Sequence, residues 1–393
     1  MKFTYSIPTK ILFGPGSFND LATTPLPGKK ALVVITAGKS MRANGYLDRL
    51  IDMLDKQGIG HALFDKILPN PVLRHVHEGA ALAREQGCDF VIGLGGGSSI
   101  DSAKSIAVMA KNPGDYWDYI SGGSGKGQPL VNGALPIVAI ATTAGTGTEA
   151  DPWTVITKED TNEKIGFGCA ETFPVLSVVD PEMMLTDRKS TRLNSSHIPI
   201  SFHATEGYIA NVATPLSDAY ALKSIELLAK YLPAAVKDGS DLEARTQVAL
   251  ASTLSGMVES TSCCTSEHGM EHALSAFYPK LPHGAGLIML SEAYYSFFAD
   301  KAPERFTAMA KAMGVVTGHL PEAERPMAFV KALVELQKAC GVDGLKMSDY
   351  GITKEDMAKC AANARHTMGG LFELDPYALS LDETTQIMMN AYK

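Results

Sequence analysis

The sequence has no cluster of basic residues, no long apolar run and no Cys-x-x-Cys pair. Its 35 Lys and Arg residues are outnumbered by 43 Asp and Glu residues, which gives a net charge of −8. Nucleic acid is not expected as a partner, because binding to a phosphate backbone needs clustered positive charge. No apolar run approaches the roughly 20 residues of a membrane-spanning helix, and the first residues do not read as a signal peptide. We therefore expect a cytoplasmic protein with no membrane partner.

The cysteines are few and scattered. Six of them occur in 393 residues, and none forms a Cys-x-x-Cys pair. This usage suits a reducing compartment and argues against a disulfide framework or a thiolate zinc site. Cys263 and Cys264 are adjacent, and we expect them to fill core space. With 45% hydrophobic and 20% charged residues, the chain has the composition of two or three globular domains.

The order of predicted elements divides the chain into two parts. Short β-branched runs at 31–35, 61–64, 90–94 and 137–141 predict strands, and apolar residues at helical spacing in 76–86 and 100–110 predict helices. This alternation is typical of a parallel sheet covered by helices. From His203 onward the sequence reads as long Ala- and Leu-rich helices. We expect an α/β domain at 1–181 and an all-helical domain at 182–393.

A glycine triplet follows the third predicted strand and opens a helix. Gly95-Gly96-Gly97 allows close approach of an anion, and the N–H groups of the following helix start can bind it. The motif is neither the G-x-G-x-x-G fingerprint nor the loop of nucleoside triphosphatases. A tight turn without a ligand is the alternative. The succession of strand, triplet and helix favours a pyrophosphate.

A second loop of this kind follows the fourth predicted strand. Residues 142–149 contain four threonines and two glycines, at the strand end where open α/β sheets bind ligands. Read alone, the segment is equally consistent with an ordinary capped helix start. Two such loops on one sheet favour a dinucleotide over a single phosphate.

Histidines are concentrated in the helical part. His268 and His272 are four residues apart and lie on one helix face, and His283 and His203 are also in this part. A single histidine is more often structural than a ligand, but three within residues 268–283 favour a metal. Neutral imidazoles suit Fe²⁺ or Zn²⁺.

These motifs, in this order, resemble the iron-containing (group III) alcohol dehydrogenase family. The resemblance runs from 11–16 to the tail motif at 368–376. It implies a dehydroquinate synthase-like architecture: a Rossmann-like dinucleotide-binding domain, a helical domain for metal and substrate, and a metal in the cleft between them. It also implies a homodimer or larger assembly.

The resemblance assigns roles residue by residue. The residues that would lie against the pyrophosphate and nicotinamide side of the cofactor are Gly96, Gly97, Ser98 and Asp101. The residues that would line the nicotinamide ribose are Thr142, Thr143 and Thr146, and Lys164 matches a cofactor-contacting lysine. The matching metal ligands are His203, His268 and His283. His272 matches a histidine near the nicotinamide and is the candidate catalytic proton relay.

The implied activity is metal-dependent, NAD(P)-linked oxidation of a small alcohol or reduction of an aldehyde. A divalent ion, Fe²⁺ with Zn²⁺ as an alternative, would polarise the alcohol oxygen while hydride passes to nicotinamide C4. Relatives that prefer NAD resemble one another in an acidic residue after the first predicted strand. Here Gly38 stands in that place with Lys39 beside it, so NAD or NADP is admissible and the pattern leans slightly toward NADP.

The sequence departs from the family at one ligand. An aspartate one helical turn before the first histidine is the family's fourth ligand, and Pro199 stands there. The surrounding segment 187–201 has no Ala or Gly. We interpret 189–201 as a translated sequencing-adapter read, a hypothesis that resequencing the source DNA tests, since recovery of the same codons would exclude it. Substitute ligands considered for the missing aspartate are His197, Glu206 and Asp187.

Other functions remain open at this point. A polyol or glycerol-type dehydrogenase, or a metal-dependent synthase that uses NAD transiently, belongs to the same superfamily. A dinucleotide-binding protein without turnover would follow from the loss of the fourth ligand. A metallohydrolase suits the histidines but not the two phosphate-type loops.

Overall fold

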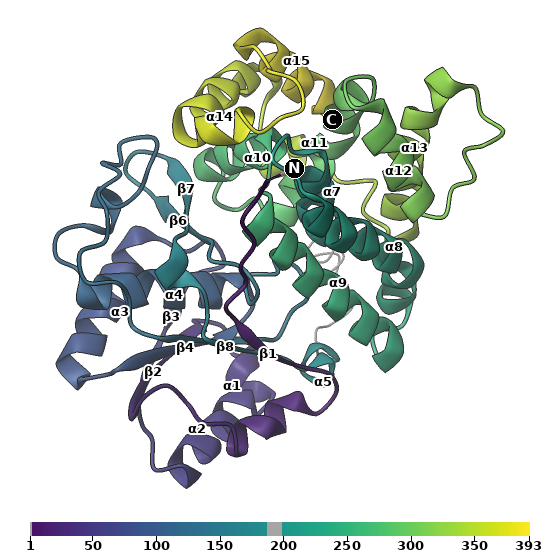
Figure 1. The fold of residues 1–393 in the computed structure, drawn as a ribbon. Helices are drawn as coiled ribbons and strands as arrows, with labels where there is room; N and C mark the ends of the chain where they lie inside the picture. Colours follow the sequence, from purple (N-terminus) through teal and green to yellow (C-terminus); the bar gives the residue numbers. More distant parts are fainter. Residues whose placement is uncertain (1, 187–198) are drawn as a thin grey trace. The chain divides into compact units, whose positions relative to one another are not determined.

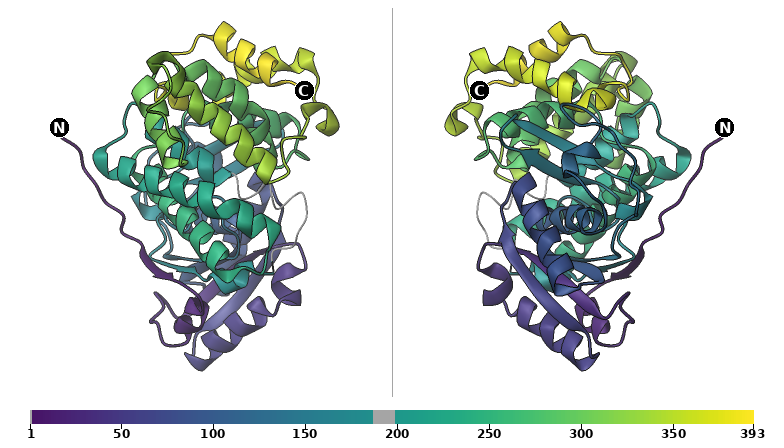
Figure 2. Two further views of the ribbon diagram at one scale, coloured as in Figure 1. Left: turned by 90° about the vertical axis from the view of Figure 1, so that its right-hand side faces the viewer. Right: turned by 90° about the vertical axis from the view of Figure 1, so that its left-hand side faces the viewer.

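The computed structural model describes residues 2–186 and 199–393, apart from the side chain of residue 199. The chain forms two compact units. The sheet unit comprises Ile7–Asp187, and the helical unit comprises Met1–Ser6 together with Arg188–Lys393. Figure 1 labels the elements of both units, and Figure 2 shows them from two further sides.

The sheet unit is built on six parallel strands in the order β1-β8-β5-β4-β2-β3. Their bounds are β1 Lys10–Phe13, β2 Lys30–Thr36, β3 Gly60–Ile67, β4 Phe90–Gly95, β5 Ile137–Ala141 and β8 Leu176–Val179. Strands β4 and β5 are buried along their whole length. This burial explains their unbroken apolar sequences, because a parallel strand is covered on both faces. The four strands predicted from the sequence correspond to β2, β3, β4 and β5.

Helices cover this sheet, and a separate hairpin follows β5. The helices are α1 Ser40–Ala43, α2 Tyr46–Lys56, α3 Leu73–Gln86, α4 Gly97–Lys111 and α5 Pro181–Met184, and the antiparallel hairpin is β6 Thr154–Lys158 with β7 Glu163–Phe167. Helix α4 lies directly on β4. A Cβ added at Gly93 would be 2.8 Å from the Cα of Ile100, so glycine at this position permits the close packing.

The helical unit contains helices and no strand among its described residues. Their bounds are α7 Pro199–Ile209, α8 Pro215–Lys237, α9 Leu242–Thr261, α10 Ser266–Phe277, α11 His283–Phe298, α12 Pro303–Ala312, α13 Arg325–Ala339, α14 Met357–Phe372 and α15 Leu381–Ala391. Helices α7, α8 and α9 pack against one another, and α10 packs against α11 and α14 (Figure 1). The predicted fold class, a parallel α/β part followed by an all-helical part, is confirmed.

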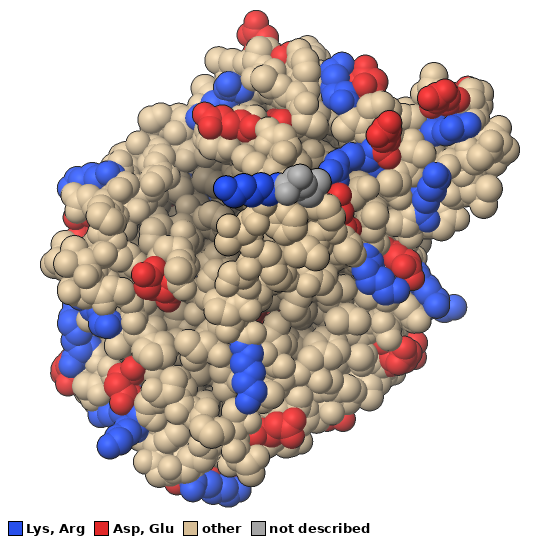
Figure 3. Space-filling model, viewed as in Figure 1, with Lys and Arg blue, Asp and Glu red and all other residues tan. Residues whose placement is uncertain are grey.

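Two surface properties bear on partners. None of the helices in the described ranges is long and apolar enough to cross a membrane. On the face drawn in Figure 3, positively and negatively charged side chains are interspersed.

Candidate active site

Three loops of the sheet unit follow the carboxyl ends of adjacent strands. Gly38 follows β2, the glycine triplet follows β4, and residues 142–149 follow β5. From β2 the chain first adds β3 on one side and then β4 on the other. Ligands of open α/β sheets bind outside the carboxyl ends of the strands at such a reversal. The loops singled out in the sequence therefore lie at the edge where this fold binds nucleotides.

The glycine triplet packs against the threonine loop. A Cβ added at Gly96 would be 2.8 Å from Thr143 Oγ1, and one at Gly97 would be 2.7 Å from Thr146 Cγ2. The N–H of Thr142 donates to the carbonyl of Gly95 at 3.0 Å. Any larger residue at these glycines would push the two loops apart. Because glycine has no side chain, these residues leave room for a cradle between the two loops.

The cradle ends at the N-terminus of α4. Gly97 is the first residue of this helix of 15 residues, and the first-turn N–H groups of a helix have no acceptor within it. The helix dipole adds partial positive charge at the same end. Gly95 has φ of +148°, a conformation that favours glycine. This arrangement fits the phosphates of a dinucleotide.

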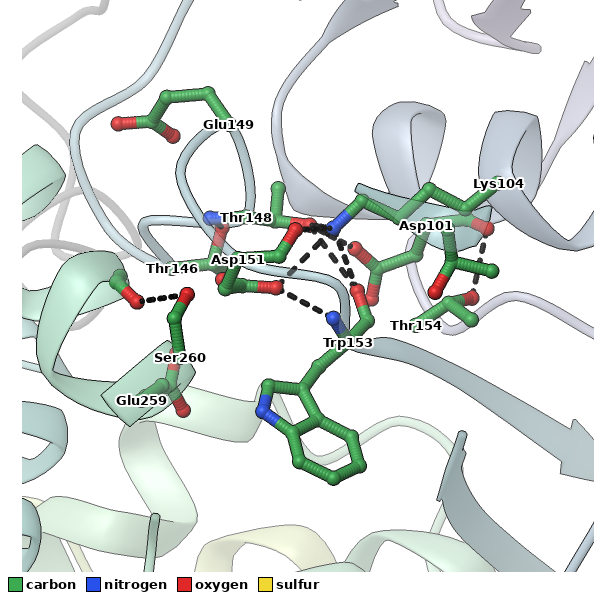
Figure 4. Close-up of polar contacts among 12 residues, drawn as sticks. Asp101, Lys104, Thr146, Thr148, Glu149, Asp151, Trp153, Thr154, Glu259 and Ser260 are labelled. Carbon is green, nitrogen blue, oxygen red and sulfur yellow. Dashed lines mark hydrogen bonds and ion pairs between the residues drawn. The ribbon is translucent and has the colours of Figure 1, made fainter. Parts of the chain in front are cut away.

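A buried lysine joins α4 to the threonine loop (Figure 4). Lys104 Nζ donates to Thr148 Oγ1 at 2.7 Å, to the Trp153 carbonyl at 2.7 Å and to the Asp151 carbonyl at 2.9 Å, and it pairs with Asp151 Oδ1 at 3.1 Å. The Lys104 side chain is fully buried. Because a buried ammonium must satisfy all its donors, Lys104 fixes the loop's conformation.

Asp101 belongs to the same cluster. Its Oδ1 accepts from Thr148 Oγ1 at 2.8 Å, and its Oδ2 accepts from the Val155 N–H at 3.1 Å. Burial raises the pKa of Asp101 and of Asp151, and the charge of Lys104 opposes both shifts. Asp101 thus helps to hold the threonine loop in place through these hydrogen bonds. Its contact with a cofactor stays a prediction.

The remaining predicted cofactor residues lie in the sheet unit. Ser98 Oγ donates to the Pro69 carbonyl. Lys164 is buried on β7, where it pairs with Thr157 of β6. Gly38 is exposed, and a Cβ added there would meet Thr36 Oγ1 at 3.6 Å, an ordinary contact. A side chain therefore fits at position 38.

Three histidines of the helical unit converge. His203 comes from α7, His268 from α10 and His283 from the start of α11, and one nitrogen from each lies within 4.8 Å of the other two. The rings of His203 and His268 are stacked with centroids 4.7 Å apart, and those of His268 and His283 are 5.3 Å apart. The structure therefore brings together the three predicted metal ligands.

Two of these rings are each held by a buried glutamate. Glu206 pairs with His268 Nδ1, and Glu271 pairs with His283 Nδ1. Both carboxylates are fully buried. A carboxylate on one ring nitrogen fixes the tautomer and directs the other nitrogen to a metal. Consistent with this, His268 Nε2 is buried and has no hydrogen-bond partner among the described residues. The three-histidine set fits a divalent metal ion.

His272 lies beside the three-histidine set. It is buried on α10, and its ring centroid is 5.6 Å from that of His283 and 6.2 Å from that of His268. An imidazole at this distance can exchange a proton with a group bound at the three-histidine set, through hydrogen bonds.

Of the three residues considered as substitutes for the missing aspartate, Glu206 is among the described residues. Glu206 uses Oε2 to accept from the Thr265 N–H at 2.7 Å and its hydroxyl at 3.0 Å, so it supports His268. His197 and Asp187 lie outside the described residues. Helix α7 begins at Pro199, four residues before His203. Proline is tolerated at a helix start but offers no ligand atom.

Comparisons with known proteins agree with these features. Residues 8–181 match the model of the iron-containing alcohol dehydrogenase family, and residues 196–392 match the C-terminal model of the Fe-containing alcohol dehydrogenase family. The chain belongs to the iron-containing alcohol dehydrogenase family. The resemblance inferred from the motifs is therefore confirmed.

Other members of the iron-containing alcohol dehydrogenase family match this chain over nearly its whole length. A choline dehydrogenase of Bacillus subtilis (strain 168) is 33% identical and aligns over 95% of this chain and 92% of its own. The NAD-dependent methanol dehydrogenase of Bacillus methanolicus is 30% identical, over 98% and 99%. The crystal structure of an archaeal alcohol dehydrogenase from a Red Sea brine pool superposes with a TM-score of 0.93, at 31% identity, over 100% of this chain and 99% of the other.

Sequence reasoning missed the role of Glu206 and Glu271 as supports of the candidate metal ligands. Glu206 follows His203 by three residues and Glu271 follows His268 by three, so each pair shares a helix face. This repeated His-x-x-Glu pattern is a sequence signal that could have drawn attention to the two glutamates. It does not give the partners, because Glu206 holds His268 and Glu271 holds His283 across different helices.

Proposed function

We propose that this chain is a metal-dependent, NAD(P)-linked alcohol dehydrogenase that also reduces aldehydes. One observation carries the proposal. Three imidazoles converge within 4.8 Å, two of them held by buried carboxylates, in a chain whose other unit has a glycine cradle at a helix N-terminus. A metallohydrolase would need the converging imidazoles but not the glycine cradle.

The nucleotide is assigned to the sheet unit. The backbone of Gly96, Gly97 and Ser98 would bind the pyrophosphate, and Thr142, Thr143 and Thr146 would contact the nicotinamide ribose, with Lys164 as a further contact. Gly38 and Lys39 stand where the adenosine ribose is recognised in such folds. A ribose 2′-phosphate would meet a cation there instead of a carboxylate, so the proposal includes NADP besides NAD.

The metal is assigned to His203, His268 and His283. Three protein ligands leave an open position, as catalytic zinc sites do. Fe²⁺ is the proposed ion, with Zn²⁺ as the alternative. When bound, the ion supplies a Lewis acid that polarises the oxygen of the alcohol or aldehyde. Glu206 and Glu271 raise the basicity of the ring nitrogens and keep their orientation.

Proton transfer is assigned to His272. In alcohol oxidation the substrate loses a hydride to nicotinamide C4 and a proton from its hydroxyl. His272 accepts that proton as a neutral imidazole and passes it toward solvent. In aldehyde reduction the direction is reversed, and the same imidazole returns the proton.

Metal removal and replacement tests this function. The protein is stripped of metal with a chelator and then reloaded anaerobically with Fe²⁺ or Zn²⁺. Both forms are assayed with NAD⁺ or NADP⁺ and with primary alcohols from methanol to butanol, and with choline. Activity should be absent from the stripped protein and return with metal. His268→Ala should abolish both metal binding and activity, whereas His319→Ala, at an exposed position of the same unit, should not. Turnover that survives metal removal would refute the proposal.

Pro199 favours a second candidate, a nucleotide-binding protein without turnover. If the three histidines alone hold metal too weakly, the purified chain should bind NAD(P) but carry no metal. Pro199→Asp would then restore metal and turnover together, because position 199 lies one helical turn before His203. The first candidate predicts metal binding before this substitution. A homodimer or larger assembly is proposed in either case and is checked by sedimentation equilibrium.

A further inference from the structure

Glu206, the carboxylate that holds the candidate metal ligand His268, is itself held by a threonine at the start of α10. Thr265 donates to Glu206 Oε2 through its N–H at 2.7 Å and through its hydroxyl at 3.0 Å. Both side chains are fully buried. Thr265 is the N-cap residue of α10, and His268 follows it by three residues on the same helix. The orientation of the imidazole therefore depends on what holds Thr265.

The hydroxyl of Thr265 also contacts a buried tyrosine. Thr265 Oγ1 is 2.9 Å from Tyr294 Oη, and Tyr294 Oη is 3.0 Å from Oδ1 of Asp375. Tyr294 is fully buried on α11, and Asp375 is 4% exposed in the segment between α14 and α15. We call this series of hydrogen bonds the buried chain, and it comprises His268, Glu206, Thr265, Tyr294 and Asp375.

The segment that bears Asp375 is attached to the end of α7. Just after this helix, Asn211 donates its N–H to the Leu374 carbonyl at 2.9 Å and its side-chain amide to the carbonyls of Glu373 at 2.7 Å and Asp375 at 3.3 Å. From α10, the Ser266 N–H donates to Asp375 Oδ1 at 3.2 Å. Because α7 also bears the glutamate of the buried chain, the two ends of the chain are held on one helix.

The three links between oxygen atoms in the buried chain need three hydrogens. Thr265 and Tyr294 supply one each, since a hydroxyl has a single hydrogen, and burial raises the pKa of Tyr294 well above its usual value. A proton on Asp375 supplies the third. Burial raises the pKa of this carboxyl to about 7, and the charge of Glu206 contributes to the rise. Asp375 Oδ2 is buried and has no hydrogen-bond partner among the described residues, which also favours the neutral acid.

We propose that Tyr294 and Asp375 are positioning residues for the metal ligand His268, with Asp375 as the hydrogen-bond donor at the end of the buried chain. They keep the carboxylate of Glu206 aligned on the imidazole, and groups that orient a metal ligand in this way affect metal affinity. The inference rests on the proposed metal site of three histidines. It extends the support of that site to α11 and to the segment between α14 and α15.

Cobalt titration of metal-free protein tests the role of Tyr294. Tyr294→Phe removes the hydroxyl that joins Thr265 to Asp375 and should weaken Co²⁺ binding by roughly 10-fold, the lower end of what loss of an outer-shell partner costs. Tyr295→Phe is the matched control, because it removes a neighbouring buried hydroxyl that is bonded to Thr205. This control should bind Co²⁺ as the wild type does. Circular dichroism of the metal-free proteins checks that both variants fold.

Two substitutions of Asp375 separate hydrogen bonding from packing. Asp375→Asn keeps both a donor and an acceptor, since an amide has both, and should retain the Co²⁺ affinity of the wild type. Asp375→Leu has a similar size but no donor, and it should weaken binding as Tyr294→Phe does. The double variant with Asp375→Leu and Tyr294→Phe should bind about as weakly as either single variant, because both changes interrupt the same chain.

Nitrogen-15 NMR of histidine-labelled, metal-free protein gives a signal that a loss of stability alone would not move. The Nδ1 resonance of His268 should shift in Tyr294→Phe and Asp375→Leu, because the hydrogen bond of this nitrogen to Glu206 changes. It should stay in place in Asp375→Asn and Tyr295→Phe. The resonance is assigned by its absence in His268→Gln.

The failures are distinguishable. Wild-type affinity and an unchanged Nδ1 resonance in Tyr294→Phe, or an equal loss of affinity in Tyr295→Phe, would overturn the positioning role while the proposed function stands. Equal losses in Asp375→Asn and Asp375→Leu would overturn the donor role of Asp375. If the wild type binds no Co²⁺, or if His268→Ala leaves the affinity unchanged, the proposed metal site itself is wrong.

Discussion

Four carboxylates, three of them buried and that of Asp101 half-buried, determine how the two candidate binding regions are built. Asp101 and Asp151 surround Lys104 in the sheet unit, and Glu206 and Glu271 hold histidines in the helical unit. Asp151, Glu206 and Glu271 each pair with a lysine or an imidazole, as a buried carboxylate requires. Asp101 accepts from Thr148 and Val155 and feels the charge of Lys104. A neutral substitution in either group would leave a partner without its counter-charge. We therefore expect these carboxylates to affect binding indirectly, by orienting the lysine and the histidines beside them.

A prediction at the residue scale concerns nucleotide choice. Gly38→Asp should shift the ratio of kcat/KM for NAD⁺ over NADP⁺ toward NAD⁺ by about 10- to 100-fold, because the new carboxylate would bind the ribose 2′-hydroxyl and repel a 2′-phosphate. The new side chain fits, with only Thr36 Oγ1 near it at 3.6 Å. Gly38→Asn adds the same bulk without charge and is the control. An equal ratio in both variants would show that position 38 does not face the ribose.

Asp375 gives a pH prediction. Burial raises the pKa of Asp375 from its usual value of 3.8 to about 7, although the hydrogen bonds from Ser266 and Tyr294 favour the ionised form. Between these pH values the folded state keeps a proton that the unfolded state releases, so wild-type stability falls as pH rises from about 4 to 7. Asn at this position has no such dependence.

The measurement is urea unfolding of wild type and Asp375→Asn at several pH values. Between pH 4 and pH 8 the variant should gain up to about 4 kcal/mol relative to the wild type, since each unit of pKa difference is worth about 1.4 kcal/mol. Asp343→Asn, which changes an exposed aspartate, should show no such trend. Parallel pH profiles for wild type and Asp375→Asn would mean that Asp375 is ionised in the folded protein.

At the scale of elements, α4 does two things at once. Its N-terminus forms the glycine cradle, and two turns later its Lys104 anchors the loop that follows β5. Helix and loop are thereby held at a fixed distance on both sides of the candidate phosphate site. Binding of a nucleotide should therefore depend on a residue that does not touch it.

Lys104→Met tests this dependence. Removal of one partner of a buried ion pair costs about 3–5 kcal/mol of unfolding free energy, and nucleotide affinity should fall because the loop at 142–149 loses its anchor. Lys111→Met, at the exposed last residue of the same helix, should change neither. Urea unfolding and fluorescence titration with NADPH measure the two effects.

A double variant separates anchoring from simple loss of stability. Lys104→Met combined with Asp151→Asn removes both charges and should recover much of the stability without recovering nucleotide affinity, because the hydrogen bonds of Lys104 to Thr148 and Trp153 stay lost. Full nucleotide affinity in Lys104→Met would contradict the anchoring role.

The sequence predicts some elements well and others not at all, for physical reasons. Strands β4 and β5 are buried on both faces, so their apolar runs are unbroken and easy to identify. Strand β1 has four residues with exposed or half-buried ends, and the hairpin of β6 and β7 mixes threonine with charged residues. Such short or polar segments have no distinctive periodicity, and the prediction omits them.

The candidate site shows the same limit. Histidine spacing points to a metal, and glycine and threonine loops point to a nucleotide, because these signals are local. The partners of those residues are set by tertiary packing. Cys264 is interpreted as core filler from the sequence, and it is buried in the loop after α9, but its thiol also donates to Glu259 near the end of that helix. No spacing rule connects the two residues to His203, whose Nε2 is 3.6 Å from Glu259 Oε1.

At the scale of the whole molecule, one chain carries two candidate binding regions of different chemistry. The sheet unit carries the glycine cradle where we propose that NAD(P) binds, and the helical unit carries three converging imidazoles and a neighbouring histidine. Family membership covers both units, with matches at 8–181 and 196–392. Hydride transfer from a small alcohol needs both units in one protein.

The most direct test follows the hydride itself. A primary alcohol that carries deuterium on its hydroxyl-bearing carbon is incubated with NAD⁺ or NADP⁺ and either metal-loaded or metal-free protein, and the nucleotide is analysed by mass spectrometry and NMR. We predict deuterium at C4 of the reduced nicotinamide with the metal-loaded protein and none with the metal-free protein. Equal transfer by both proteins, or transfer by neither, would contradict the account.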